Sequence, residues 1–153
     1  MEMITFRKLT ADEKLEYLTR AANENRLKFL FDIKNVDWNW IKAQTVFGAF
    51  YNGQLLVFYY FYNLNDQTWH TAFGYFGKFT RNTLHVIRHC LKSARMQYGI
   101  IGEVNSRNTQ TLRLCRTYLE HPQEFILANA DENDTDRHIF YWHKLKESEV
   151  KNG

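Results

Sequence analysis

The chain has 153 residues, which is about one domain and enough to bury a core without disulfide or metal staples. Apolar residues make up 44% of it and only one proline is present, which excludes a proline-rich linker and a disordered composition. The net charge of +3 would suit an anionic ligand but falls short of the charge typical of a nucleic-acid-binding domain.

Neither export nor a membrane anchor is expected. Residues 1–8 contain no apolar signal core, and the apolar run around residues 55–62 is too short to span a bilayer. Cys90 and Cys115 each fall within a predicted helix and lack the dense spacing of a secreted scaffold. We therefore expect a cytoplasmic protein in a reducing compartment.

The N-terminal part predicts a short strand followed by helices. The strand covers residues 4–7, and Thr10 with Glu13 forms a capping box that starts a helix. The apolar face of this helix is expected to include Leu15, Leu18 and Ala22. After a break near Asn25, a second helical piece would carry Leu27, Leu30 and Phe31. The segment 37–43 fits either a short helix or a loop.

A three-stranded antiparallel meander is predicted next, with strands at 45–51, 54–62 and 68–76. Asn52 and Gly53 supply the positive backbone dihedrals of a two-residue hairpin turn, and residues 63–66 make a second turn. Five consecutive aromatic residues, 58–62, predict a strand that is buried on both faces or covered by a partner.

The second half alternates helices and strands. Thr80 caps a helix with regular apolar spacing that Gly99 ends, and residues 100–104 form a strand. Ser106 or Asn105 caps a further helix through about residue 119, which Pro122 blocks from continuing. Two strands at 124–128 and 138–145 complete the sheet.

The polar stretch 131–137 is expected to be a flexible hairpin loop, and the charged tail 146–153 is expected to be frayed. The sequence thus predicts one α+β domain over residues 1–145, followed by that tail. Its mixed, mostly antiparallel sheet would have about seven strands flanked by about four helices.

This element order resembles the GNAT (GCN5-related N-acetyltransferase) superfamily over roughly residues 45–145. The sharpest likeness is the segment 103–115, EVNSRNTQTLRLC, which is similar to the strand, asparagine and helix that run past the pantetheine arm of acetyl-CoA in that family. The resemblance implies acetyl-CoA as cofactor and no metal. It also implies that residues 74–77 and 101–105 form the two walls of the pantetheine slot.

A diphosphate needs several backbone N–H groups and the positive end of a helix, and glycines let a loop approach it closely. The family uses a basic-x-x-Gly-x-Gly loop, where this chain has KFTRNT at 78–83, with Arg81 and Thr83 in the glycine positions. Side chains there would crowd the cradle. The cofactor-binding residues that the resemblance implies are Tyr75, Phe76, Lys78, Thr80, Arg81, Thr83, Asn105 and Asn108.

The general acid of the family is a tyrosine seven positions after the asparagine that opens the last helix. Counted from Asn108, that position is Cys115, which is equally an ordinary buried residue of the helix. Tyr118 and Tyr75 are alternative acids. For the general base, His70 comes first and Glu103 second, although a histidine among aromatics is often a hydrogen-bonded core residue.

Three other patterns have simple alternatives. His85 and His89 have a spacing that can bind a metal, but no third ligand is apparent and basic residues surround them. That basic stripe is either solvated surface or an attraction for cofactor phosphates or an acidic partner. The aromatic cluster suggests core packing or a protein interface in preference to base stacking, because Lys42 is the only basic residue near it.

Two functions are therefore carried forward. The first is acetyl transfer from acetyl-CoA to an unidentified amine or protein acceptor. The second is a catalytically inactive GNAT-fold binding or structural protein, similar to small proteins of tailed bacteriophages, which would act through a homo-oligomer or a protein partner on its aromatic-rich surface. Neither a membrane nor a nucleic acid is expected as partner.

Overall fold

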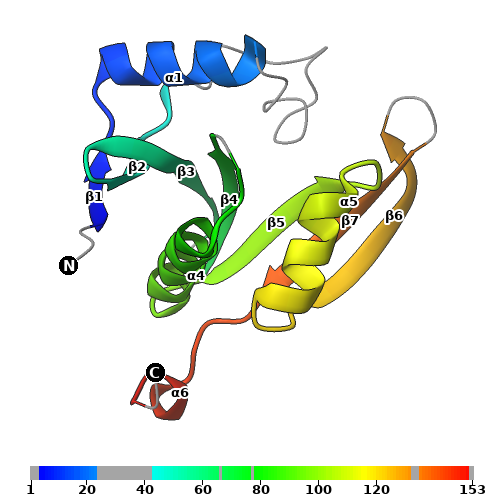
Figure 1. The fold of residues 1–153 in the computed structure, drawn as a ribbon. Coiled ribbons are helices and arrows are strands. Elements are labelled where there is room, and N and C mark those ends of the chain that lie inside the picture. The colour runs from blue at the N-terminus through cyan, green and yellow to red at the C-terminus, as the bar shows by residue number, and fades with distance from the viewer. Residues whose placement is uncertain (1–3, 24–42, 66, 77, 132–134, 152–153) are drawn as a thin grey trace. The chain divides into compact units, whose positions relative to one another are not determined.

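A computed structural model describes residues 4–23, 43–65, 67–76, 78–131 and 135–151 (Figure 1). The chain divides into two compact units. Unit 1 comprises Met1–Tyr62 and Ala72–Ile87, and unit 2 comprises Asn63–Thr71 and Arg88–Gly153. The predicted second helical piece and the segment 37–42 lie outside the described residues, as does the tip of the predicted loop at 132–134.

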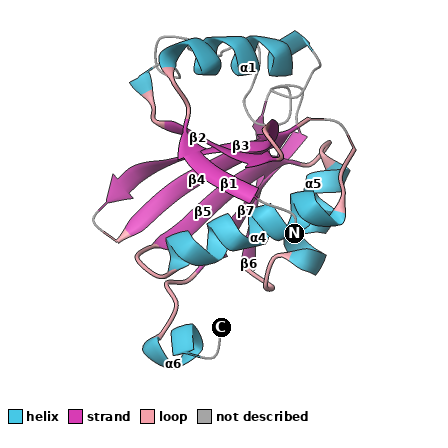
Figure 2. Ribbon diagram, turned by 60° about the vertical axis from the view of Figure 1, so that its left-hand side comes forward, coloured by secondary structure: helices cyan, strands magenta, loops and turns pink. Residues whose placement is uncertain are grey.

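Seven strands pair in the order β1-β2-β3-β4-β5-β7-β6 (Figure 2). Their bounds are β1 Ile4–Lys8, β2 Val46–Tyr51, β3 Gln54–Asn65, β4 Thr68–Tyr75, β5 Gly99–Asn105, β6 Gln123–Asp131 and β7 Thr135–Trp142. The β4–β5 pair is parallel, whereas β1–β2, β2–β3, β5–β7 and β6–β7 are antiparallel. The predicted mixed, mostly antiparallel sheet is confirmed.

The described residues contain four helical segments, three of which were predicted. They are α1 Ala11–Asn23, α4 Arg81–Arg95, α5 Thr109–Arg113 with its π-helical continuation η2 Leu114–Tyr118, and α6 Glu147–Lys151. No helix among the described residues is long and apolar enough to cross a membrane.

In unit 1, the predicted capping box starts α1. The Thr10 amide donates to Glu13 Oε1 at 3.0 Å, and the Glu13 amide donates to Thr10 Oγ1 at 3.2 Å. Arg7 also donates two 2.7 Å hydrogen bonds to the Glu13 carboxylate, and this pairing lowers the pKa of Glu13 to about 2. Leu18 is buried as expected, but Leu15 is 55% exposed, so its place on the apolar face was wrongly predicted.

The predicted hairpin of unit 1 is confirmed. Asn52 and Gly53 have φ values of 49° and 85°, the left-handed geometry that a two-residue turn requires. The aromatic run that follows does not have two buried faces: Phe58 and Tyr60 are buried, whereas Tyr59 and Phe61 are partly exposed. The core of unit 1 consists of Leu9, Leu18, Val46, Phe50, Phe58, Tyr60 and Phe76.

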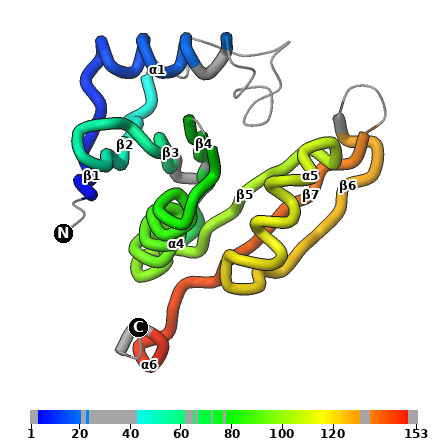
Figure 3. Tube along the Cα trace, in the orientation of Figure 1, coloured from blue at the N-terminus to red at the C-terminus, as the bar shows by residue number. Residues whose placement is uncertain are grey.

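In unit 2, β5, β7 and β6 run side by side, with α5 and η2 against one face (Figure 3). Trp142 Nε1 donates to the Leu119 carbonyl at 2.7 Å and so ties β7 to the end of η2. The buried residues of this layer include Ile100, Val104, Leu112, Leu114, Cys115 and Phe140.

Two predicted helix ends were wrong. The α4 helix ends at Arg95, and Gly99 instead begins β5, where a side chain would meet the Tyr141 hydroxyl at 2.9 Å. The α5 helix is capped by Asn108 instead of Ser106 or Asn105. The turn predicted at 63–66 is also shorter, because β3 continues to Asn65.

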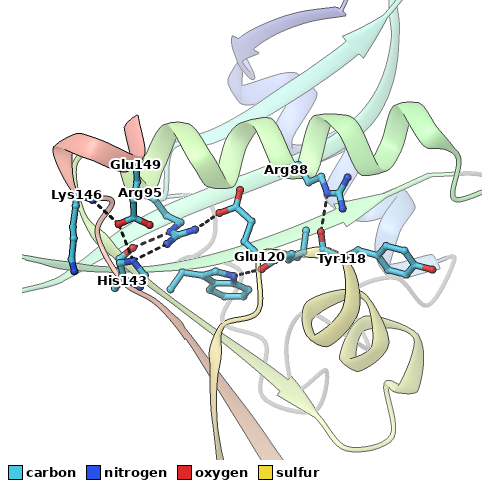
Figure 4. A network of polar contacts seen from close by, with 9 residues as sticks. Arg88, Arg95, Tyr118, Glu120, His143, Lys146 and Glu149 are labelled. Atoms are coloured by element: carbon cyan, nitrogen blue, oxygen red, sulfur yellow. Dashed lines mark hydrogen bonds and ion pairs between the residues drawn. The ribbon is translucent and has the colours of Figure 1, made fainter. Parts of the chain in front are cut away.

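Within the tail, residues 147–151 form a short helix, α6, which was not predicted. The Leu145 amide donates to the Arg95 carbonyl at 2.8 Å, and α6 follows. Arg95 is buried at the centre of a polar network, in which its Nε donates to the His143 carbonyl at 2.9 Å and its Nη1 pairs with Glu120 (Figure 4). These contacts hold the tail against the end of α4 within unit 2.

Candidate functional site

The start of α4 in unit 1 is closed by two threonines. The Thr80 amide donates to Thr83 Oγ1 at 3.2 Å, and the Thr83 amide donates to Thr80 Oγ1 at 3.3 Å. Their hydroxyls also lie 3.2 Å apart. Thr83 therefore takes the part of the glutamate in a capping box, and its buried side chain is turned to Thr80.

This cap leaves two backbone N–H groups at the helix N-terminus available to bind a ligand. The Leu84 amide donates to the Thr80 carbonyl and begins the regular pattern, whereas the amides of Arg81 and Asn82 have no hydrogen-bond partner among the described residues. Lys78 and Arg81 have exposed side chains beside these amides. Two backbone donors, the helix dipole and two cationic side chains together can bind an anion.

Tyr75 and Phe76 lie just before this cap and belong to unit 1. The Tyr75 ring packs edge-on against Phe79, with 5.4 Å between the ring centroids. Phe76 is buried in the core, its ring lies 4.3 Å from the Arg20 guanidinium, and its amide donates to the Leu56 carbonyl. The side chain of Phe76 is therefore structural, although it was predicted as a cofactor contact.

In unit 2, Asn105 and Asn108 shape the passage from β5 into α5. Asn105 Oδ1 accepts from the Arg107 amide at 2.8 Å, while its amide group donates to Thr135 at 3.1 Å. Asn108 is buried, its Oδ1 caps α5 by accepting from the Thr111 amide at 3.1 Å, and its own amide donates to the Asn105 carbonyl. Both side chains thus stabilise the turn itself.

Cys115 points into the apolar layer of unit 2 and is only 2% exposed. Burial, with a smaller contribution from Glu124, raises the pKa of its thiol to about 12. A thiol of this pKa is a weak acid near neutral pH. Its environment thus favours the packing role over the acid role, both of which the sequence left open.

Tyr118 is the more accessible of the two candidate acids on this helix, with an exposed fraction of 39%. Its carbonyl accepts from Arg88 Nε at 2.8 Å, while its ring points away from the polar network (Figure 4). The helix between Asn108 and Tyr118 is not uniform, because η2 begins at Leu114. The spacing of seven residues between the family's asparagine and its tyrosine assumes a regular α-helix. Because the pitch changes at Leu114, counting seven residues from Asn108 does not by itself identify the equivalent position in this helix.

His70 lies in an ionisable cluster with two partners. Its Nε2 is 3.4 Å from Glu103 Oε2, and the same oxygen is 3.6 Å from Arg137 Nη1. The contact with His70 is the main reason why the pKa of Glu103 lies below its ordinary value. His70 is buried whereas the Glu103 side chain is partly exposed, so the carboxylate is the part of the pair that meets solvent.

A second ionisable cluster was not predicted from the sequence. Arg116 donates hydrogen bonds of 2.7 and 2.6 Å to Glu124, and the Glu124 carboxylate lies 2.7 Å from His138 Nδ1. The Arg116 contact, with help from His138, lowers the pKa of Glu124 to about 2. No local pattern could have indicated this group, or Arg137, because the members come from separate elements.

The described residues contain no group of three His, Cys, Asp or Glu side chains placed to hold a metal, and the histidines of α4 belong to no such group. The predicted residues of the diphosphate loop belong to unit 1. His70, Asn105, Asn108, Cys115 and Tyr118 belong to unit 2. The structure brings together His70 and Glu103, and also Asn105 and Asn108.

Solved structures supply the comparison with known proteins. An acetyltransferase of the GNAT family from Bacillus anthracis superposes with a TM-score of 0.72 at 14% identity, covering 92% of this chain and 95% of that one. The yncA protein of Salmonella typhimurium, solved with its cofactor acetyl-CoA, gives 0.72 at 12% identity, covering 95% and 96%. A ribosomal-protein-alanine N-acetyltransferase from Brucella melitensis gives 0.68 at 14% identity, covering 91% and 99%.

No family model and no curated protein matches the sequence. The structural likeness shows the fold, which this chain shares with these acetyltransferases over nearly its whole length.

Proposed function

We propose that this chain, which has the GNAT fold, is an N-acetyltransferase that moves the acetyl group of acetyl-CoA to an amine. The observation that carries the proposal is the fold itself, because the three structures compared above are acetyltransferases that it matches over 91% to 95% of its length. The presence of acetyl-CoA in the yncA structure supports the choice of cofactor.

The start of α4 supports a place for the cofactor diphosphate. We assign this group to the amides of Arg81 and Asn82, with the side chains of Lys78 and Arg81 supplying positive charge. The Thr80 hydroxyl and amide are already used in the cap, so their contribution would be to hold the helix start in shape. This division of roles explains how a loop without the two glycines can still bind a diphosphate.

The strand β5 supports a place for the pantetheine arm. Among the pairs that the structure describes, its parallel pairing with β4 runs from Thr68 with Gly99 to His70 with Ile101, whereas its pairing with β7 runs from Ile100 with Trp142 to Asn105 with Arg137. We assign the remaining β4-side edge of β5, residues 102–105, to the pantetheine amides, which can pair with a strand as a peptide does.

The reaction needs one base and one acid. The amine nitrogen attacks the thioester carbonyl carbon, a C–N bond forms, the C–S bond breaks, and coenzyme A leaves as a thiolate. We assign His70 as the group that accepts the amine proton, because Glu103 at 3.4 Å can stabilise the imidazolium that results; since His70 is buried, the proton would reach it through the partly exposed Glu103 carboxylate. Glu103 itself, with its lowered pKa, would be the weaker base.

For the acid that returns a proton to the thiolate, we favour Tyr118 over Cys115. Proton transfer from a thiol of pKa about 12 to a thiolate whose conjugate acid has an ordinary pKa of about 8.5 is uphill by roughly 5 kcal/mol. Tyr118 is also exposed, whereas Cys115 is enclosed by the apolar layer.

Calorimetric titration with acetyl-CoA tests the proposal. We expect a dissociation constant in the micromolar range, and binding no tighter than millimolar would contradict it. Arg81→Ala removes one charged contact to the diphosphate and should weaken binding about tenfold, which corresponds to about 1.4 kcal/mol. Lys144→Ala removes an exposed positive charge just after β7 and serves as the matched control, with unchanged binding expected.

A binding protein without catalysis is the second candidate, and the threonine cap is the observation that favours it. Thr80 and Thr83 satisfy two of the backbone donors that a diphosphate would otherwise use. Under this alternative, acetyl-CoA would not bind and a protein partner would co-purify. The same titration therefore separates the two functions.

A further inference from the structure

The strand β6 is the last strand in the order of the sheet. Its outer edge therefore has no neighbouring strand among the described residues. Every second residue of such a strand directs its N–H and C=O groups away from β7. Phe125, Ile126 and Leu127 are 54%, 57% and 48% exposed at this edge. Consecutive exposed apolar residues on an edge strand are a surface that can pair with another strand.

The charges on β6 do not oppose such pairing. Native edge strands are often protected by lysine or proline, and β6, with the sequence QEFILANAD, contains neither. Its residues 125–130 carry no charge. Glu124, which directly precedes these residues, is charged, but its carboxylate is already paired with Arg116 and His138 on its own chain.

We propose that β6 pairs antiparallel with β6 of a second copy of this chain, about a twofold axis at Ile126. In this register Ile126 faces its own copy and Phe125 faces Leu127, so the three exposed apolar residues meet only one another. Glu124 faces Ala128 and no like charges meet across the axis. The uncharged, self-complementary strand is the reason to choose a second copy over a different partner.

The oligomeric state tests this pairing. Sedimentation equilibrium of the wild-type chain should give twice the mass of one chain. Ile126→Lys places two like charges opposite each other at the axis and should give a monomer with an unchanged circular dichroism spectrum. Leu15→Lys adds the same charge at an apolar residue of α1 with 55% exposure and should leave the dimer intact.

Cysteine cross-linking tests the register. Residues directly opposite each other in an antiparallel pair have Cα atoms about 4.5–5.5 Å apart, within the range of a disulfide. Ile126→Cys should therefore give a covalent dimer on mild oxidation. Ala128→Cys is the matched control, because its own copy would lie four residues along, about 13 Å away, which no disulfide spans.

A wild-type chain that sediments as a monomer at every concentration would overturn the proposal, as would a dimer that Ile126→Lys leaves intact. Efficient cross-linking of Ala128→Cys with none of Ile126→Cys would overturn the register. Acetyl-CoA binding is expected to be the same for wild type and Ile126→Lys, so this result and the fate of the acetyltransferase proposal are measured separately.

Discussion

Burial sets the chemistry of Cys115. With a pKa of about 12, about one thiol in ten thousand is ionised at pH 8, and the side chain is enclosed as well. We expect a disulfide reagent at pH 8 to modify Cys90, which is partly exposed, and to leave Cys115 unmodified in the folded protein. Both should react in denaturant, and rapid native reaction of two thiols would contradict the burial of Cys115.

The ion pairs of Glu124 make the stability of the folded chain depend on pH in the acid range. Its pKa is about 2 in the folded chain against an ordinary value of 4.5, so ionised Glu124 stabilises the fold fully above pH 4.5. This contribution is lost as the pH falls from 4.5 to 2. Glu124→Gln should therefore lower the free energy of unfolding at pH 7 and approach the wild-type value near pH 2, as measured by urea unfolding at several pH values.

The control for this variant is Glu16→Gln, which neutralises an exposed carboxylate of α1. Its curve of unfolding free energy against pH should follow that of the wild type. If Glu124→Gln also followed the wild type, the ion pair with Arg116 and His138 would contribute nothing to folding.

At the scale of the element, the start of α4 depends on a hydroxyl at position 83. Thr83→Val keeps the shape of the buried side chain but removes the acceptor for the Thr80 amide. We expect this variant to lose about 1 kcal/mol of unfolding free energy, measured by chemical denaturation. Thr83→Ser keeps the hydroxyl and should retain most of the cap.

The Thr83→Ser variant also tests whether Thr83 contacts the cofactor, through its affinity for acetyl-CoA. If Thr83 acts only as a cap, Thr83→Ser should bind acetyl-CoA as the wild type does, because its hydroxyl still closes the helix start. A large loss of affinity in Thr83→Ser would instead show that the residue contacts the cofactor directly.

The features that residues close together in the sequence determine could be predicted. The Thr10 capping box, the Asn52-Gly53 turn and the Thr80 cap each depend on neighbouring residues, and each was predicted. The errors occurred where distant contacts decide. The end of α4 was misplaced because Gly99 is not a helix cap: it begins β5, where a Cβ atom would lie 2.9 Å from the hydroxyl of Tyr141, about forty residues away.

In the candidate site, too, individual residues could be predicted, whereas the contacts between distant residues could not. His70 and Glu103 were each predicted as candidate bases, but their pairing, the contact with Arg137 and the group around Glu124 depend on strand register that no single sequence displays. The acid stays a prediction: Cys115 and Tyr118 were both named from the sequence, and the change of helical pitch at Leu114, which bears on the choice between them, was not foreseen. The resemblance to phage proteins stays a prediction.

The division into two units raises the question of whether the chain folds as the single domain expected from its length. Three elements, β3, β4 and α4, have residues in both units. Because no unit can be formed without parts of these shared elements, we expect one cooperative transition with coincident far-ultraviolet circular dichroism and tryptophan fluorescence. Two separated transitions would contradict a single domain.

The π-helical turn at Leu114–Tyr118 has a consequence for the two candidate acids that it contains. A turn closed by i to i+5 hydrogen bonds holds one residue more than a turn of α-helix, so it accommodates a one-residue insertion without displacing the structure on either side. Cys115 and Tyr118, the two candidate acids of this helix, therefore lie within the wider turn. Deletion of one residue from this turn should restore an ordinary helix that still leads to Leu119 and its contact with Trp142.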